Sequence, residues 1–381
     1  MLSENAQLAL DTILQKPVKG IPAWLINPME HGIIDRLAGE PEGTYRRAYE
    51  PTYLKMLRNA GCCMVDQYIP NNPLSMGSHG YESDAARGAT TGAEEIVRDG
   101  IRIDSPEAVV EHMEKVVFPQ LRMSAATFDE DKRVEEMLAG ERRIQDVLGP
   151  DMLKAPYGCA GFPGLSYGHY GYVNYFMAYA LYPEVMEKHF SLQADCWAIW
   201  NRATARAYRE GNLPPLLRLD HDMADSRGTL VDIKSLDKIW FPHFARALEP
   251  MLKSDVRMIW HCDGNLSQMA PRLLEAGLRG FQGFQYEDGM DYEKICRMKD
   301  REGRDLVIIA GVSVTCTLPH GTPADVKREM DWLVRNGPKT GLFLGGSSSI
   351  APGVSWENMQ TLVEGFKYYR EHGRTGTGLA G

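Results

Sequence analysis

The stretch MIWHCDGNLSQM, residues 258–269, places a histidine, a thiol and a carboxylate in succession after an apolar run. Side chains alternate between the two faces of a strand, so we expect His261 and Asp263 on one face and Cys262 on the other. An imidazole and a carboxylate on one face can bind a metal ion or act as an acid–base pair. The ordinary alternative is a strand tip whose polar side chains only meet water.

Similar residue types follow other apolar runs of the sequence. Asp220, His221 and Asp222 in RLDHDMADSRG could hold a second metal ion or the polar end of a substrate. For Asp222 a helix cap or an ordinary loop acid is the alternative. The remaining predicted substrate contacts are polar or aromatic residues after apolar runs: Asn27, His31, Asp66, Gln67, Tyr167 and His169.

Residues 161–185 are unusually rich in aromatic side chains. Rings with hydroxyl tips suit a flat, apolar ligand. At helical spacing, however, such rings are more often core residues, which is what we expect of Phe176, Tyr179 and Tyr182. Tyr167, His169 and Tyr170 are expected in a loop, where we expect them to line a pocket.

Short apolar runs alternate with helix-like segments along the chain. The runs are residues 21–27, 62–68, 157–162, 215–220, 257–263, 280–286, 306–312 and 341–346. Most of these runs are continuously apolar, as strands covered on both faces are. Ser105-Pro106 and Thr322-Pro323 are typical of helix starts. The pattern predicts an α/β fold, a (β/α)8 TIM barrel with extra N-terminal helices.

The predicted barrel spans residues 1–381 as a single domain. The segment 68–153 is too long for a single connection between two parallel strands. It therefore predicts a long helical insertion after the second strand, over the barrel mouth, which is the end of the barrel where the carboxyl ends of its strands lie. A doubly wound open sheet is the competing fold, but no G-x-G-x-x-G motif follows the first strand. Barrel enzymes carry their chemistry at the carboxyl ends of the strands, where His261 and Asp263 are expected.

Composition narrows the class of protein. The net charge of −9 and the pI near 5.6 argue against nucleic-acid and anionic-membrane partners. No apolar run is long enough for a transmembrane helix, and the first residues have no basic segment typical of a signal peptide. Seven cysteines without a C-x-x-C pair indicate reduced thiols, so we expect a cytoplasmic protein.

Four segments carry a family resemblance: IPAWLI at 21–26, HCDGN at 261–265, GTPADVKREM at 321–330 and GSSSIAPGVSWENMQTLVEGFKYY at 346–369. In this order and spacing the chain resembles the uroporphyrinogen decarboxylase superfamily, which includes cobalamin-dependent methyltransferases. The resemblance implies a barrel with its active site at the strand carboxyl ends. Decarboxylases of that family bind the carboxylates of the porphyrinogen with paired arginines that follow the first strand. Asn27 and His31 stand there instead, which argues against a porphyrinogen substrate.

The methyltransferase branch implies a zinc site built from His-x-Cys, a glutamate and a second cysteine. Carried onto this sequence, those positions are His261, Asp263, Glu287 and Ser348, so both thiolates are replaced. The resemblance therefore implies a divalent metal such as zinc on His261, Asp263 and Glu287. With oxygen ligands such a metal would polarise an oxygen of the methyl donor, as O-demethylation of an aryl methyl ether requires. We expect His261, Asp263 and Asp220 to be catalytic.

The same resemblance implies a Co(I) corrinoid as methyl acceptor. None of the ten histidines follows an aspartate by two residues, so the D-x-H-x-x-G signature of corrinoid carriers is absent from the sequence. The corrinoid is therefore expected on a separate carrier protein. Two alternatives remain open, namely a decarboxylase of a non-porphyrin acid and a non-catalytic accessory protein that docks a corrinoid carrier. Release of CO2 against formation of a methylcorrinoid would separate the two enzymes.

Overall fold

The computed structural model describes residues 2–25, 27–71, 95–376 and 378–379. Its main sheet has five parallel strands in the order β11-β10-β9-β8-β5. The strands of the chain are β1 (Met64–Val65), β2 (Val97–Arg98), β3 (Ile101–Arg102), β4 (Leu153–Lys154), β5 (Leu216–Asp220), β6 (Ala224–Asp225), β7 (Gly228–Thr229), β8 (Arg257–His261), β9 (Gly280–Gln282), β10 (Val307–Val312) and β11 (Leu342–Gly346).

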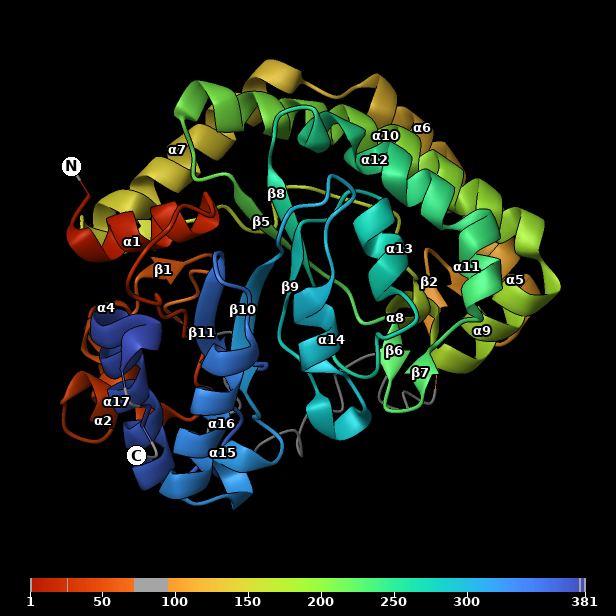
Figure 1. Cartoon of the computed structure of the whole chain (residues 1–381). Coiled ribbons are helices and arrows are strands. Elements are labelled where there is room, and N and C mark those ends of the chain that lie inside the picture. Colours follow the sequence, from red (N-terminus) through yellow and green to blue (C-terminus); the bar gives the residue numbers. More distant parts are fainter. Residues whose placement is uncertain (1, 26, 72–94, 377, 380–381) are drawn as a thin grey trace.

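The five-stranded sheet continues into a closed barrel. Ala23 forms parallel bridges with both Leu344 of β11 and Cys62 next to β1. β1 pairs in parallel with β4, and Tyr157 just after β4 bridges Arg218 of β5. The ring therefore runs from the segment around Ala23 through β1, β4, β5, β8, β9, β10 and β11 and back, with every pairing parallel (Figure 1). This confirms the predicted (β/α)8 barrel.

Longer helices such as α7, α10 and α12 surround the barrel on its outer side (Figure 1). The helical segments of the described residues are α1 (Glu4–Ile13), α2 (His31–Ala38), α3 (Thr44–Arg47), α4 (Tyr49–Ala60), α5 (Pro106–His112), η1 (Met113–Val117), α6 (Phe118–Ala126), α7 (Glu130–Leu148), α8 (Tyr167–Tyr170), α9 (Tyr172–Leu181), α10 (Pro183–Gly211), α11 (Ile233–Ile239), α12 (Phe241–Leu252), α13 (Ala270–Glu275), η2 (Tyr286–Asp288), α14 (Tyr292–Arg297), α15 (Thr317–His320), α16 (Pro323–Asn336), α17 (Trp356–His372) and η3 (Gly373–Thr375). None of the described helices is long and apolar enough to cross a membrane.

Local sequence signals position two of these helices as predicted. The Ser105 hydroxyl accepts a hydrogen bond from the Ala108 amide at the start of α5. Thr322 and Asp325 form a reciprocal capping box at the start of α16, which ends at Gly337. Caps of this kind satisfy amide groups that have no partner within the helix, so the sequence fixes where each helix begins.

The third strand lies earlier in the chain than predicted. The expected run at 157–162 is a loop after the bridge at Tyr157, and the strand is β4 (Leu153–Lys154). The sequence pattern did not indicate β4 because Lys154 interrupts the apolar run. Its side chain is buried and forms an ion pair with Glu141 of α7 at 2.9 Å. The charge is thus paired inside the protein, where an unpaired ammonium would be costly.

The segment between the second and third strands has two described parts. The β2–β3 hairpin and α5 lie beside α9, where the Asn174 side chain donates to the Ile103 carbonyl. α7 packs against α10 and β4 in the outer ring. Part of the predicted insertion is therefore the regular barrel helix that precedes β4. Residues 72–94 lie outside the described residues.

His189 of α10 gives a prediction about stability. Its ring is buried against Phe118 and Phe190, and burial lowers the pKa of His189 to about 4. The unfolded chain binds this proton near pH 6.5, so the folded state loses roughly 3 kcal/mol as pH falls from 6.5 to 4. We expect His189→Leu to flatten this part of the stability profile, measured by urea unfolding across that range. An unchanged slope in the variant would contradict the assignment.

Candidate active site at the carboxyl ends of the strands

His261 is the last residue of β8, and its ring is held in one orientation. All five residues of β8 are buried, and the Nδ1 of His261 lies 3.2 Å from the Gln282 carbonyl of the neighbouring strand β9. A carbonyl can only accept, so Nδ1 carries the proton and donates it. The other nitrogen, Nε2, is then a free acceptor in the neutral ring and lies 3.9 Å from Oδ1 of Asp263.

Asp263 is fixed from two sides. Its backbone amide donates to Oδ1 of Asp222 at 3.0 Å, and the Ser348 hydroxyl donates to its Oδ2 at 3.4 Å. Burial raises the pKa of Asp263, the carboxylates of Asp222 and Asp220 raise it further, and His261 opposes the shift. His261 and Asp263 therefore form a pair in which the carboxyl group is biased toward holding a proton.

Gly283 makes room for the His261 ring. It has a φ of +69°, and a Cβ on it would lie 2.0 Å from the Ser347 carbonyl oxygen and 3.2 Å from Nδ1 of His261. Only glycine fits both the backbone conformation and this close approach. The imidazole of His261 can therefore take this position only with a glycine at position 283.

We expect Gly283→Ala to destabilise the fold by about 2 kcal/mol or more, because the new methyl group displaces the Ser347 backbone or the His261 ring. Gly158→Ala is the matched control, since Gly158 has a similar φ of +65° but no atom within 4 Å of its would-be Cβ. Denaturant unfolding of both variants checks this. Equal losses in the two variants would show that backbone strain alone, and not the contact with Ser347, limits position 283.

Arg218 of β5 lies at the centre of a second group in the barrel mouth. Its guanidinium donates to Asp66 and to Asp220, each at 2.8 Å, and to the Gln67 side chain at 3.4 Å. It also lies over the Tyr157 ring at 4.5 Å, and the Tyr157 hydroxyl donates to Asp220 at 3.2 Å. Two carboxylates thus neutralise one buried cation.

The charges of this second group hold each other ionised. Burial alone would raise the pKa of Asp66, yet Arg218 and the hydrogen bonds from Gln67 and Trp24 keep it below its usual value. Burial likewise works against the charge of Arg218, but Asp66, Tyr157 and Asp220 raise its pKa above the usual value. Asp66 is therefore an ionised partner of Arg218, and its role as a substrate contact stays a prediction. Its neighbour Asp220 keeps 36% of its side chain exposed toward the mouth.

Tyr167 and His221 form a wall beside Asp222. Their rings stack with centroids 5.8 Å apart, and the Tyr167 hydroxyl donates to the Asp222 carbonyl at 2.8 Å. His221 accepts a hydrogen bond from the Leu165 amide at Nε2, and burial lowers its pKa. His221 is therefore a neutral ring that positions the 161–165 loop. Tyr167 lies next to the site, as its predicted role requires.

Some predicted site residues have partners away from His261. His31 is hydrogen-bonded to Arg46 and lines a hollow of about 560 Å³ with Glu30 and Gly353. The His169 ring lies against His112 and Tyr170. The buried side chain of Asn27 accepts from the Tyr53 hydroxyl at 2.5 Å. Their roles as substrate contacts stay predictions, and these contacts do not join them to the pair of His261 and Asp263.

The predicted metal ligands are not gathered at one point. Glu287 lies in η2, and its carboxylate accepts hydrogen bonds from the hydroxyls of Ser313 and Thr315. Within the described ranges no three His, Cys, Asp or Glu side chains are grouped as metal ligands would be. Cys262 cannot supply a thiolate, because its sulfur is bonded to the Met223 amide and burial raises its pKa to about 12. The residues present do not fit the three-ligand site, so we derive no step through a metal.

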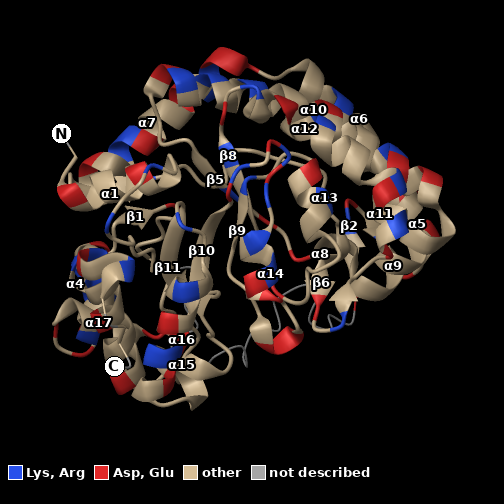
Figure 2. Ribbon diagram, in the orientation of Figure 1, with Lys and Arg blue, Asp and Glu red and all other residues tan. Residues whose placement is uncertain are grey.

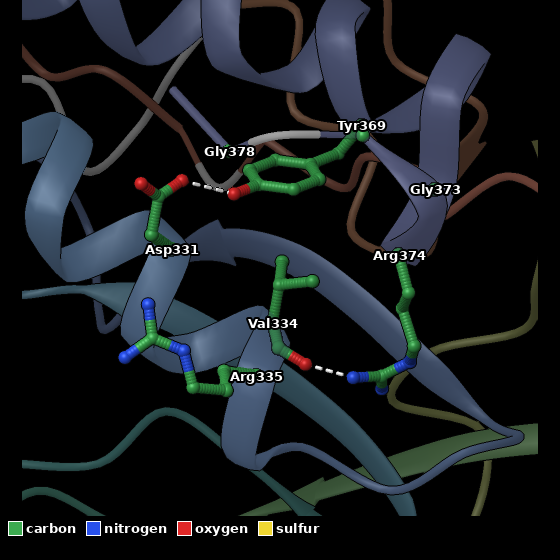
Figure 3. A pocket seen from close by; sticks show the side chains of 8 residues that line it. Asp331, Val334, Arg335, Tyr369, Gly373, Arg374 and Gly378 are labelled. Carbon is green, nitrogen blue, oxygen red and sulfur yellow. Dashed lines mark hydrogen bonds between the residues drawn. The ribbon is translucent and has the colours of Figure 1, made fainter. Parts of the chain in front are cut away.

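A well-formed hollow lies elsewhere on the barrel. It has a volume of about 310 Å³ at the carboxyl ends of α16 and α17, where Tyr369 donates to Asp331 and Arg374 to the Val334 carbonyl (Figure 3). The helices of a barrel run opposite to its strands, so their carboxyl ends mark the face opposite the mouth. This hollow is therefore separate from the His261 site.

Sequence reasoning missed Arg218, Tyr157 and Gln282. Arg218 was legible as a charge inside the apolar run PLLRLD, since a cation on a buried strand needs an anionic partner. Tyr157 was hidden by the misplaced third strand. For Gln282 the functional atom is its backbone carbonyl, which accepts from His261, and the sequence carries no signal for that.

Comparisons with known proteins agree with this architecture. The family model described as uroporphyrinogen decarboxylase (URO-D) matches residues 222–369, which include His261 and Asp263. A methyltransferase from Methanosarcina mazei superposes with a TM-score of 0.57 at 14% identity, covering 97% of this chain and 99% of that chain. A B12-independent methionine synthase from Shewanella sp. W3-18-1 covers 60% of this chain and 66% of that chain at 12% identity, with a TM-score of 0.39 that supports no inference.

No curated protein matches the sequence. Residues 222–369 thus carry the uroporphyrinogen decarboxylase sequence pattern, on a (β/α)8 barrel that the whole chain shares with the methyltransferase from Methanosarcina mazei.

Proposed function

We propose that the protein is a methyltransferase that moves a methyl group from a small O-methylated donor, an aryl methyl ether, to a Co(I) corrinoid on a partner protein. The observation that carries the proposal is the pair of His261 and Asp263 at the end of β8, with Asp263 biased toward its protonated form. A departing oxygen needs a proton at the moment its methyl group leaves, and a positioned carboxyl group can donate it.

The charges around the pair support an uncharged donor. The cation of the second group in the barrel mouth is Arg218, and Asp66 and Asp220 already neutralise it. A substrate rich in carboxylates would meet Asp220, Asp222 and Asp263 without a free guanidinium to compensate. This favours methyl transfer over the decarboxylation of a non-porphyrin acid, and it argues against porphyrinogens in particular.

Each residue of the site has a part in this reaction. Asp263 donates its proton to the ether oxygen as the carbon–oxygen bond breaks, and the carboxylate that remains keeps the hydrogen bond from the Ser348 hydroxyl. Gln282 and Ser348 hold the two side chains in place. The stacked rings of Tyr167 and His221 offer a flat wall for an aromatic ring. The corrinoid supplies the nucleophile that takes the methyl group.

The test is an anaerobic assay of the purified protein with free Co(I) cobalamin and a panel of methoxylated aromatic compounds. We expect methylcobalamin and the demethylated phenol to form together in equal amounts. The same samples are assayed for CO2 release from aromatic and aliphatic carboxylic acids. Release of CO2 without methyl transfer would replace this proposal by the decarboxylase, and neither product from any compound would favour a non-catalytic accessory protein.

A further inference from the structure

The one-turn helix α8 (Tyr167–Tyr170) begins with a residue of the active-site wall. Tyr167 stacks on His221 and its hydroxyl donates to the Asp222 carbonyl at 2.8 Å, so the barrel mouth holds the tip of this ring. The residues of α8 and α9 include no Lys, Arg, Asp or Glu, and both helices are tan in Figure 2. The backbone of α8 therefore depends on hydrogen bonds and packing for its position.

Three polar groups in a row connect the last residue of α8 to the β2–β3 hairpin. The Tyr170 hydroxyl lies 2.9 Å from Nδ1 of His112 on α5, and Nε2 of the same ring lies 2.9 Å from Oδ2 of Asp99. A carboxylate only accepts, so Nε2 donates to Asp99, and in the neutral ring Nδ1 accepts from the Tyr170 hydroxyl. Tyr170 is 1% and His112 2% exposed, so water has little access to the bond between them. Asp99, His112 and Tyr170 form a continuous link, the hairpin link.

The turn of the hairpin presents this link to α5. Asp99 and Gly100 are its two turn residues, with φ of +49° and +80°, the conformation that Asp-Gly sequences favour in two-residue turns. The neighbouring Arg98 donates from Nε to the His169 carbonyl at 2.9 Å. The hairpin thus reaches α8 twice, through the backbone of His169 and through the side chain of Tyr170.

Aromatic packing surrounds the hairpin link. The His112 ring lies edge-on to the Tyr170 ring with centroids 5.5 Å apart, and Tyr170 stacks on Tyr175 of α9 at 6.3 Å. Asn174 of α9 donates to the Ile103 carbonyl just after β3 at 3.1 Å. The hairpin, α5 and α9 therefore form one packed unit around the carboxyl end of α8.

We propose that the hairpin link positions Tyr167 in the wall of the active site, so that its members are positioning residues and not catalytic ones. The inference rests on the proposed function, since the wall is where the aromatic donor lies. Tyr167 and Tyr170 are the two ends of one helical turn, so the mouth and the hairpin hold the same turn from opposite ends. Loss of the link frees the carboxyl end of α8, and the Tyr167 ring then spends less time stacked on His221.

The link acts on binding of the donor more than on the chemical step. The wall contacts the donor ring before and during methyl transfer alike, and loss of such uniform binding raises KM while kcat stays the same. His261 and Asp263 lie at a different strand end and keep their own partners, the Gln282 carbonyl and the Ser348 hydroxyl.

Asp99→Gly tests the link, because glycine keeps the turn conformation and removes the carboxylate. With the most active compound of the methoxylated aromatic panel, we expect KM to rise at least about tenfold and kcat to stay within about twofold of wild type. Asp99→Asn is the conservative variant. Asparagine tolerates the same backbone conformation and keeps an oxygen that accepts from Nε2 of His112, so the KM should return most of the way to wild type.

A second pair of variants tests the other end of the link. Tyr170→Phe removes the hydroxyl that His112 accepts and should raise KM as Asp99→Gly does. Tyr179→Phe is the matched control, since the Tyr179 hydroxyl is bonded to Ser235 of α11 and has no part in the link. Its KM and kcat should equal those of wild type.

Hydrogen exchange of the full chain without donor tests the link independently of catalysis. The amides of His169 and Tyr170 bond to the Ser166 carbonyl within α8. Their exchange should accelerate at least about tenfold in Asp99→Gly and Tyr170→Phe and stay unchanged in Tyr179→Phe. If the wild type transfers no methyl group, the proposed function fails, whereas exchange still decides whether the link holds α8. Unchanged exchange in Asp99→Gly, a fall in kcat without a rise in KM, or no recovery in Asp99→Asn would overturn the proposal.

Discussion

His261→Ala is expected to reduce methyl transfer by about 10²–10⁴-fold, the usual contribution of a positioned acid–base group. Nε2 of His261 is the nitrogen that faces Asp263, and no other side chain among the contacts described here can take its place. Alanine leaves the Asp263 carboxyl group without its neighbour and opens space between β8 and β9. The measurement is the rate of methylcobalamin formation at saturating donor, with folding checked by circular dichroism.

Two controls make this loss specific. Cys262→Ser should stay within about threefold of the wild-type rate, because a hydroxyl can keep the bonds that the thiol makes with Met223 and Asp263. His243→Ala removes an imidazole from α12, outside the barrel, and should have no effect on the rate. A strong loss in Cys262→Ser with none in His261→Ala would mean that the strand presents the opposite face to the site.

The same samples test the metal prediction. Metal analysis of wild type and of His261→Ala asks whether a divalent ion is retained and whether the imidazole holds it. A stoichiometric ion lost with His261 would show that the ligands gather on binding, since Glu287 now faces Ser313 and Thr315. Full activity after chelation would show that the reaction needs no metal ion. The proton of Asp263 would then be the group that assists the departing oxygen.

The barrel could be predicted because most strands and several helix ends have local causes. A run such as residues 306–312 is apolar throughout, and a buried parallel strand needs just that. Thr322 and Pro323 set the start of α16 through groups within four residues of each other. The third strand was misplaced because Lys154 breaks the pattern and its partner Glu141 lies on a different element. A buried ion pair depends on distant residues that no local pattern contains.

The site was predictable only at its strand tips. Alternation places His261 and Asp263 on one side of the chain, and the 3.9 Å between Nε2 and Oδ1 agrees with it. The orientation of the imidazole depends on a backbone carbonyl of β9 and on the absence of a side chain at Gly283. Glu287 was placed with them through the family resemblance, but its direction depends on the hydroxyls that follow β10. Contacts between side chains of different strands are set by packing, which a single sequence does not display.

Arg218→Met is expected to lower the free energy of unfolding by about 3–5 kcal/mol, the typical cost of breaking a buried ion pair. Methionine fills similar space but leaves Asp66, which is 4% exposed, without its cation. Asp220 also loses its partner but is exposed enough to be hydrated, so most of the cost arises at Asp66. Urea unfolding at neutral pH measures the loss.

The pH dependence distinguishes this cause from simple loss of packing. In the wild type the lowered pKa of Asp66 contributes stability that is present above the unfolded pKa of about 3.9 and is lost as pH falls through the folded value. In Arg218→Met burial acts alone on Asp66 and raises its pKa, so protonation relieves the penalty and the gap between the two proteins narrows as pH falls. Adding Asp66→Asn to Arg218→Met should recover part of the stability at neutral pH, because an amide needs no counter-charge. A gap that stays constant from pH 7 to 4 would assign the loss to packing over Tyr157 and Trp24 instead.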